Sequence, residues 1–232
     1  MIKAENIYQR SPFFIQKILF NIYAHKITKL KFQIYFYTKL QQLEESQFYS
    51  LSDLQALQQE KFKIMIKHCY DNVPYYRKLF DEINLKPSDL CSLEDINRIP
   101  ALTREQVKNN LFSLTAMNIP ENQRLNRNTS GTTGSPMFFF VDKKSFPINR
   151  AYTWRYWNWA GFNFDDKRIT LHGRRIINHQ RTKAPFWMYN KKDKQLFFST
   201  YHLSEDFIPY FVKKLLEFKP QAIDAYPSAI YV

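Results

Sequence analysis

The stretch LNRNTSGTTGSPMFFFVD, residues 125–142, marks a change of pattern in this chain. Helical periodicity precedes it, whereas the runs LNRNT and MFFFVD at its two ends are typical of strands. Between these runs lies TSGTTGSP, residues 129–136, which places five hydroxyl side chains around Gly131 and Gly134. The whole chain has only 4 glycines. Because two of the four lie only three residues apart, this backbone is expected to adopt positive φ angles or to approach a ligand closely.

Such a loop has the chemistry of a phosphate-binding site. Converging backbone N–H groups and small hydroxyl donors are well suited to a polyphosphate. The stretch matches neither the Walker pattern, which needs a Gly-Lys pair, nor the Gly-x-Gly-x-x-Gly dinucleotide fingerprint. An ordinary Ser/Thr/Gly turn between two strands has the same composition, so the residues alone leave both interpretations open.

After this loop, strands and helices alternate, which favours an α/β layer arrangement. Asp142 can cap the helix that follows, and Gly161 is placed to end it. The expected helices cover residues 144–160 and 204–218, with Ser204 as the cap of the second, and the expected strands cover 168–173, 195–200 and 221–226.

Before the loop, the sequence predicts a mainly helical region. Apolar residues recur at helical spacing, and two pairs of polar residues three apart, Ser92 with Asp95 and Thr103 with Gln106, are placed to cap further helical turns. The expected helices cover residues 11–43, 52–71 and 74–83. We therefore divide the chain into a helical region, 1–118, and an α/β portion, 119–232, which together form one incomplete large domain.

The charge of the chain is strongly positive and uneven. The formal net charge is +13, and residues 1–43 hold seven Lys/Arg against Glu5 alone. Residues 167–194 hold nine against Asp193 alone. An anionic partner and a merely solvated basic surface both fit this pattern. The basic, aromatic segment 11–43 can lie on an anionic membrane surface or pack across the main domain, and no specific nucleic acid is expected.

Other residue types carry less information. Cys69 and Cys91 have no metal-ligand spacing, and the sequence predicts no metal site. No secretory signal pattern and no 18-residue uncharged apolar run are present, so we expect a cytoplasmic protein. His172 and His202 follow expected strands, but neither has a carboxylate or nucleophile at a telling spacing. The sequence alone identifies no catalytic residue.

The ordered string is more specific than its composition. TSGTTGSP resembles the phosphate-binding signature of the adenylate-forming superfamily, the acyl-CoA synthetases and their relatives. Met137 stands where many members have lysine, a departure common in the phenylacetate–CoA ligase branch. HCYDNVPYYRKLF (68–80) and SLEDINRIPALTREQVKNN (92–110) also resemble that family. Residues 154–174, 184–190, 197–215 and 225–232 resemble its capsular polysaccharide biosynthesis (CapK-like) branch.

This resemblance implies a function. Such proteins use ATP, with Mg²⁺, to activate a carboxylate small molecule as an acyl adenylate, and then transfer the acyl group, for example to coenzyme A. The loop would hold the ATP phosphates, and His202 and Tyr226 would lie near the acyl and nucleotide sites. The implied phosphate-binding residues are Thr129, Ser130, Gly131, Thr132, Thr133 and Gly134.

The resemblance also implies parts that this sequence does not contain. In the family, an acidic magnesium-binding segment, a ribose-binding aspartate and a catalytic lysine in a small C-terminal domain follow later in the chain. We therefore expect these 232 residues to be an N-terminal half, without full turnover. Two alternatives are a truncated nucleotide-binding fragment without catalysis and a basic peripheral membrane-binding protein.

Overall fold

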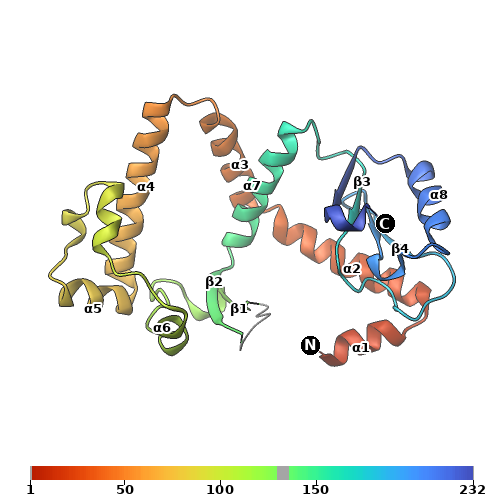
Figure 1. Cartoon of the computed structure of the whole chain (residues 1–232), viewed down its shortest axis with the longest axis horizontal. Coiled ribbons are helices and arrows are strands. Elements are labelled where there is room, and N and C mark those ends of the chain that lie inside the picture. The colour runs from red at the N-terminus through yellow and green to blue at the C-terminus, as the bar shows by residue number, and fades with distance from the viewer. Residues whose placement is uncertain (1, 130–135, 232) are drawn as a thin grey trace. The chain divides into compact units, whose positions relative to one another are not determined.

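The structure is a computed structural model that describes residues 2–129 and 136–231. Figure 1 shows its helices and strands. The helices are α1 (Ile2–Arg10), α2 (Phe13–Lys31), α3 (Ile34–Ser46), α4 (Leu51–Asn72), α5 (Pro74–Glu82), α6 (Arg104–Asn109), α7 (Ser145–Trp159) and α8 (Ile208–Phe218). The strands are β1 (Arg124–Asn128), β2 (Phe138–Asp142), β3 (Arg168–Leu171), β4 (Trp187–Asn190), β5 (Gln195–Phe198) and β6 (Ala222–Ala225). The predicted α/β class is confirmed.

The chain divides into two compact units. One unit joins Met1–Leu40 to Arg150–Val232, and the other is Gln41–Asn149. The first contains a four-stranded sheet of order β4-β5-β3-β6, in which β3 runs parallel to both β5 and β6, and β4 antiparallel to β5. The second contains the β1–β2 hairpin together with α4, α5 and α6. The predicted division at residue 118 stays a prediction.

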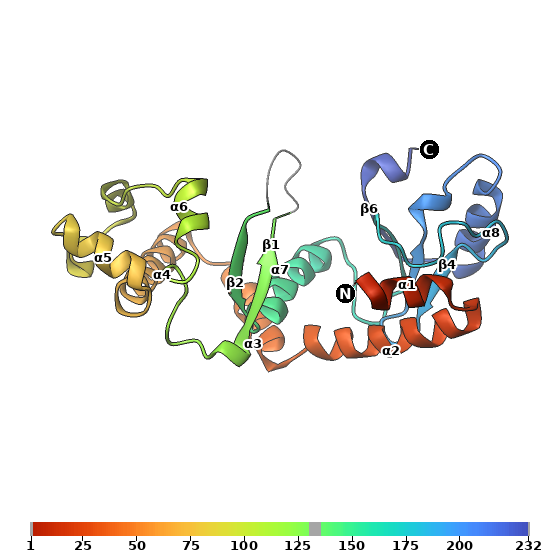
Figure 2. The same cartoon turned by 90° about the horizontal axis from the view of Figure 1, so that it is seen from below.

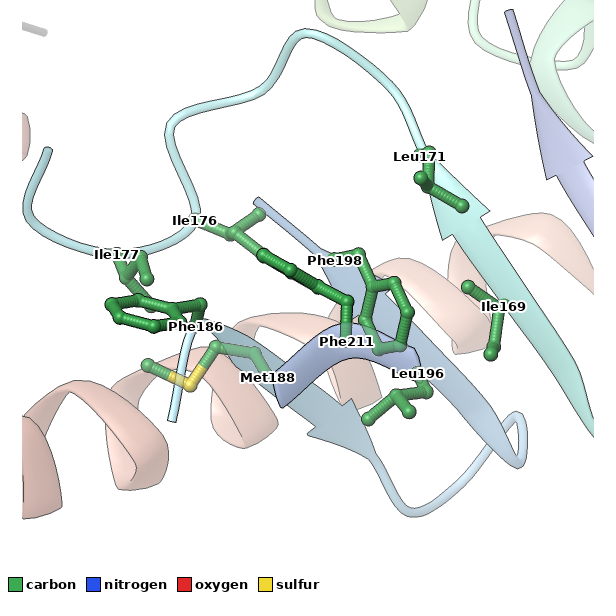
Figure 3. Packing of buried hydrophobic residues seen from close by; sticks show 9 residues of the cluster. All are labelled: Ile169, Leu171, Ile176, Ile177, Phe186, Met188, Leu196, Phe198 and Phe211. Carbon is green, nitrogen blue, oxygen red and sulfur yellow. The ribbon is translucent and has the colours of Figure 1, made fainter. Parts of the chain in front are cut away.

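The sheet of the first unit is covered on both faces. Successive side chains of a strand point to opposite faces, so Phe197 and Phe198 contact different layers. Phe197 meets Phe20 of α2 with ring centroids 5.5 Å apart, and Phe198 meets Phe211 of α8 at 5.0 Å. Figure 3 shows the buried cluster of this unit. Its members are Ile169, Leu171, Ile176, Ile177, Phe186, Met188, Leu196, Phe198 and Phe211.

A buried carboxylate attaches α2 to this sheet. Asp193 lies in the turn between β4 and β5 and accepts a hydrogen bond of 2.7 Å from the Thr28 hydroxyl. The same carboxylate lies 3.6 Å from the Lys31 ammonium and 3.7 Å from the Arg168 guanidinium. Burial, and then the charge of Arg150, lower the pKa of Lys31 to about 8. The half-buried Lys31 and the buried Arg168 therefore both lie close to one buried carboxylate, which compensates part of their charge.

The N-terminal helical prediction is confirmed with one interruption. Residues 11–43 do not form a continuous helix, because α2 ends at Lys31 and α3 starts at Ile34. Phe32 leaves helical geometry at φ −109° and ψ 59°, and its ring packs against Phe36 and Trp154. Trp154, from the aromatic run of α7, is buried at 1% exposure and stacks on Phe164. Its role is core packing.

Two predicted caps at later helices had different outcomes. Asp142 accepts the N–H of Lys144 at 2.9 Å directly ahead of α7, and Gly161 follows this helix at φ +76°, as predicted. Ser204 is not the cap of α8, which begins only at Ile208. The carbonyl of Ser204 instead accepts the N–H groups of Phe207 and Ile208, so a turn precedes the helix.

Candidate functional site

The first candidate region is the hairpin whose strands β1 and β2 flank the TSGTTGSP segment. β1 and β2 pair antiparallel, with Asn128 opposite Phe138 as the last pair of the ladder. The next two residues close the hairpin. The N–H of Thr129 donates to the Met137 carbonyl at 3.0 Å, and the N–H of Met137 donates to the Thr129 hydroxyl oxygen at 3.2 Å. The two ends of the connecting segment are therefore held side by side.

The remaining predicted phosphate-binding residues are not placed. Ser130, Gly131, Thr132, Thr133 and Gly134 lie outside the described residues. Thr129 is described and half-buried, and its hydroxyl already accepts one hydrogen bond. The strands flanking the loop were predicted as 125–129 and 137–142, and they are observed within one residue of that. The phosphate-binding role of the loop stays a prediction.

The second candidate region lies at one edge of the four-stranded sheet. β3, β5 and β6 are parallel, so their carboxyl ends lie at the same edge, where ligands bind in open α/β sheets. His172 directly follows β3, and Asp224 lies near the end of β6. The His172 Nε2 atom is 3.3 Å from Asp224 Oδ1. Both side chains are about one-third exposed, so this pair is accessible from solvent.

Tyrosines complete this edge. The Tyr226 ring lies 5.3 Å from the His172 ring, and its side chain is exposed. The Tyr226 N–H donates to the Leu171 carbonyl at 3.4 Å, which continues the β3–β6 ladder beyond its last pair. From the β5 side, the Tyr201 hydroxyl lies 3.5 Å from the Gly173 carbonyl. The Arg175 guanidinium lies 5.8 Å from the centre of the Tyr201 ring.

This arrangement has a definite chemical character. A histidine beside a carboxylate can hold one tautomer and exchange a proton. Exposed aromatic rings offer flat apolar surfaces, and a guanidinium can meet an anionic group with forked donors. We name His172, Asp224, Tyr226, Tyr201 and Arg175 the carboxyl-edge cluster.

His202 lies in different surroundings from Tyr226. Its ring is buried at 4% exposure, stacks on Phe186 at 5.0 Å, and has Nδ1 2.8 Å from the Ser199 hydroxyl. Burial lowers the pKa of His202 below its ordinary value. Its Nε2 atom has no hydrogen-bond partner among the described residues. His172, and not His202, is therefore the histidine that shares the edge with Tyr226, and substrate contact by His202 stays a prediction.

Sequence reasoning missed the partner of His172. Asp224 is far from His172 in the sequence, so no spacing rule connects them. The parallel register places Thr170 opposite Asp224 and Leu171 opposite Ala225. That register would have indicated the pair, because residues that end neighbouring parallel strands meet at one edge.

Two negative findings apply to the described part of the chain. No group of three or more His, Cys, Asp or Glu side chains there is arranged to hold a metal ion. Among the described helices, none combines the length and the apolar character that spanning a bilayer requires.

Comparison with known proteins gives relatives of two kinds. No family model matches the chain. Protein CapK of Staphylococcus aureus is 26% identical over 225 residues, which is 97% of this chain and 48% of CapK. The phenylacetate–coenzyme A ligase of Escherichia coli is 37% identical over 100 residues, or 43% of this chain and 22% of the ligase. That of Aromatoleum evansii is 38% identical over 95 residues, 40% of this chain and 21% of the ligase.

The chain thus spans about half the length of CapK, and the segment that matches the ligases covers about a fifth of their length. The similarity to CapK extends over nearly the whole chain, whereas the similarity to the ligases is higher but confined to part of it. The resemblance predicted from the sequence is confirmed, and the chain is related to the adenylate-forming, phenylacetate–coenzyme A ligase-like family.

Proposed function

We propose that this chain belongs to an ATP-dependent ligase that activates a carboxylate and works in capsular polysaccharide biosynthesis. The observation that carries the proposal is the ordered string TSGTTGSP at the end of a closed β-hairpin. Similarity to CapK and to phenylacetate–coenzyme A ligases supports the same reaction class.

In this proposal the hairpin anchors a phosphate-binding loop. Ser130, Thr132 and Thr133 supply hydroxyl donors, and Gly131 and Gly134 allow backbone N–H groups to approach the phosphates. The two hydrogen bonds between Thr129 and Met137 fix the ends of the loop. Fixed ends reduce the conformational entropy that the loop loses when it closes on a ligand.

The proposed reaction has two steps. An oxygen of the carboxylate attacks the α-phosphorus of ATP, the bond from that phosphorus to the bridging oxygen breaks, and pyrophosphate leaves. A thiol, such as that of coenzyme A, then loses its proton and attacks the acyl carbon, and AMP leaves. Donors to the phosphate oxygens assist the first step because negative charge shifts toward the departing pyrophosphate.

Magnesium fits this scheme as a partner of the nucleotide. Mg²⁺ prefers oxygen ligands and is commonly held by substrate phosphates together with one or two carboxylates. When bound, it would neutralise part of the phosphate charge.

The carboxyl-edge cluster is the proposed contact for the small-molecule substrate. Arg175 can attract an anionic carboxylate, and the Tyr201 and Tyr226 rings can contact its apolar part. His172 and Asp224 add a polar pair that is accessible from solvent. Within this proposal Tyr226 is a binding residue, as the family resemblance implied.

Exchange of labelled pyrophosphate into ATP tests the reaction with the full-length protein and a panel of carboxylates. We expect exchange that depends on one class of carboxylate. Thr132→Val and Thr133→Val keep the shape of the side chain but remove a hydroxyl, and each should weaken ATP binding by about tenfold to a hundredfold, since hydrogen bonds to charged groups contribute about 1.5–3 kcal/mol.

Thr182→Val is the matched control, because Thr182 is exposed in the other unit and distant in sequence from the loop. Its affinity for ATP in calorimetric titration should equal that of the wild type. Binding of ATP without exchange for any carboxylate would contradict the ligase proposal and support nucleotide binding alone. Absence of ATP binding would contradict both.

A further inference from the structure

The inner face of helix α2 packs against the sheet of its unit. Gln16, Ala24 and Thr28 are buried, and Thr28 donates its hydroxyl to Asp193. Asn21 donates its side-chain N–H to the Tyr189 carbonyl of β4 at 3.1 Å. These contacts fix the rotation of α2 about its own axis, and so they determine which side chains point outward.

The outer face of α2 is unusually apolar. Phe14, Ile18 and Ile22 follow one another at intervals of four residues, so they form one stripe along the helix. Their side chains are 66%, 56% and 63% exposed. In Figure 2, α2 lies along the border of its unit, with the strands and α8 on one side of it. A helix that only covers a sheet needs no such stripe.

Lysines, but no acidic residues, lie near this apolar stripe. Lys26 and Lys29 follow Ile22 by four and seven residues, so they lie on the same side of the helix as the stripe, and both are exposed. No Asp or Glu occurs between residues 6 and 43. Lys31, by contrast, turns inward to Asp193, and Lys39 lies over the Tyr152 ring. We name the set Phe14, Ile18, Ile22, Lys26 and Lys29 the outer face of α2.

We propose that the outer face of α2 binds the surface of an anionic lipid bilayer. A helix that lies in the interface buries apolar side chains at the acyl boundary while lysines reach lipid phosphates. The outer face offers both groups along one helix. No described helix spans a membrane, so the contact is with the surface.

Other occupants fit the outer face less well. A second copy would bring Lys26 and Lys29 against the same lysines in an isologous contact, with no acid on the face to compensate them. A nucleic acid would meet the lysines through its phosphates but leave the stripe of Phe14, Ile18 and Ile22 in water.

Co-sedimentation with vesicles tests this proposal on the full-length protein. The probes are vesicles of phosphatidylcholine with phosphatidylserine at 3:1, and vesicles of phosphatidylcholine alone. We expect retention on the anionic vesicles that declines as salt is raised, and little retention on neutral ones. Absence of retention on anionic vesicles at low salt would overturn the proposal.

Two variants of the outer face separate its apolar and charged parts. Ile18→Ser with Ile22→Ser should lower partitioning by about tenfold or more, because large apolar side chains no longer enter the bilayer. Lys26→Gln with Lys29→Gln should lower it by about twenty-five-fold, at about fivefold for each lysine near an anionic surface, and should weaken the salt dependence. These side chains are exposed, so circular dichroism should show an unchanged fold.

Matched controls come from α8. Leu216 is 65% exposed and Lys213 is exposed, but both lie on a different helix of the same unit. Leu216→Ser and Lys213→Gln should leave retention unchanged. An equal loss in these controls would overturn a specific role of α2. Dimerisation in sedimentation equilibrium, or DNA binding, that is lost in Ile18→Ser with Ile22→Ser would overturn the bilayer as the occupant.

Discussion

The proposed phosphate-binding loop on the β1–β2 hairpin and the proposed carboxyl-edge cluster on the four-stranded sheet are encoded differently in the sequence. The hairpin is an exposed two-stranded ladder, and its last three pairs involve at least one exposed residue. The proposed loop of the hairpin consists of eight consecutive residues, TSGTTGSP, and their order can be recognised in the sequence without a structure. The four-stranded sheet has strands buried on both faces, and its functional candidates come together only when the strands pair.

This difference teaches where each kind of site can be found. A backbone-and-hydroxyl loop needs glycines and small residues in one continuous order, so its sequence is recognisable. A side-chain cluster at a sheet edge needs only that strands end beside one another, so its residues can be scattered. Substitutions should therefore act mainly on function at the hairpin and on both stability and function at the sheet.

The largest effect should come from the buried charge that holds α2 on the sheet. Asp193→Ala leaves Lys31 and Arg168 without their carboxylate, and breaking such a pair costs about 3–5 kcal/mol. Urea unfolding measures this loss. Asp165→Ala removes a carboxylate that is 95% exposed and 3.0 Å from Lys194, and it should cost less than about 1 kcal/mol. Equal losses would show that burial does not distinguish the two pairs.

A core truncation should be next in size. Ile169 in β3 is fully buried, and Ile169→Ala should lower the free energy of unfolding by about 2–5 kcal/mol. Phe138 in β2 is 48% exposed, and Phe138→Ala should change it by at most about 1 kcal/mol. Thermal and urea unfolding of both variants make the comparison. A larger loss of unfolding free energy in Phe138→Ala than in Ile169→Ala would contradict the view that the hairpin contributes less to stability than the buried sheet.

An effect on activity with little change in stability is expected at the carboxyl edge. Asp224→Asn removes the charge beside His172, and we expect carboxylate-dependent ATP–pyrophosphate exchange to fall about tenfold, equivalent to about 1.4 kcal/mol. The pair is partly exposed, so unfolding should change by less than about 1 kcal/mol. Asp165→Asn, at an exposed carboxylate 3.0 Å from the Lys194 ammonium, is the control and should leave exchange unchanged. Unchanged exchange in both variants would remove the edge from the proposed site.

The smallest effect should be a pH dependence due to His202. Burial lowers the pKa of this histidine in the folded state, so the unfolded chain binds its proton more readily. The free energy of unfolding should therefore fall as pH drops below about 6.5, the ordinary histidine pKa. Urea unfolding between pH 7.5 and about 5 should show a flatter dependence for His202→Gln. An equal slope in the variant would locate the titrating group elsewhere.

Much of the fold could be predicted because it depends on local signals. The Asn-Val-Pro break between α4 and α5, and the capping pair Thr103 with Gln106, are properties of a few adjacent residues and were confirmed. β4 was missed, although the aromatic run at Trp187–Asn190, the polar turn after it and the apolar run of β5 form a hairpin signal.

The candidate site divides in the same way. Thr129 and its neighbours could be proposed from sequence order, whereas the pairing of His172 with Asp224 depends on strand register. The inward turn of Lys31 depends on a turn between β4 and β5, far along the chain. No local pattern of residues encodes such contacts, because packing of distant segments produces them.

The contact between Thr28 and Asp193 also has a consequence for synthesis. These residues are 165 positions apart, and α2 is made long before the strands that it covers. At about 5–20 residues per second, a ribosome needs about ten to thirty seconds to bridge that distance. Throughout this interval the face of α2 that packs on the sheet lacks its partner strands. The apolar side chains on the inner face of α2 therefore lack their final packing partners for most of the time that the chain is being made.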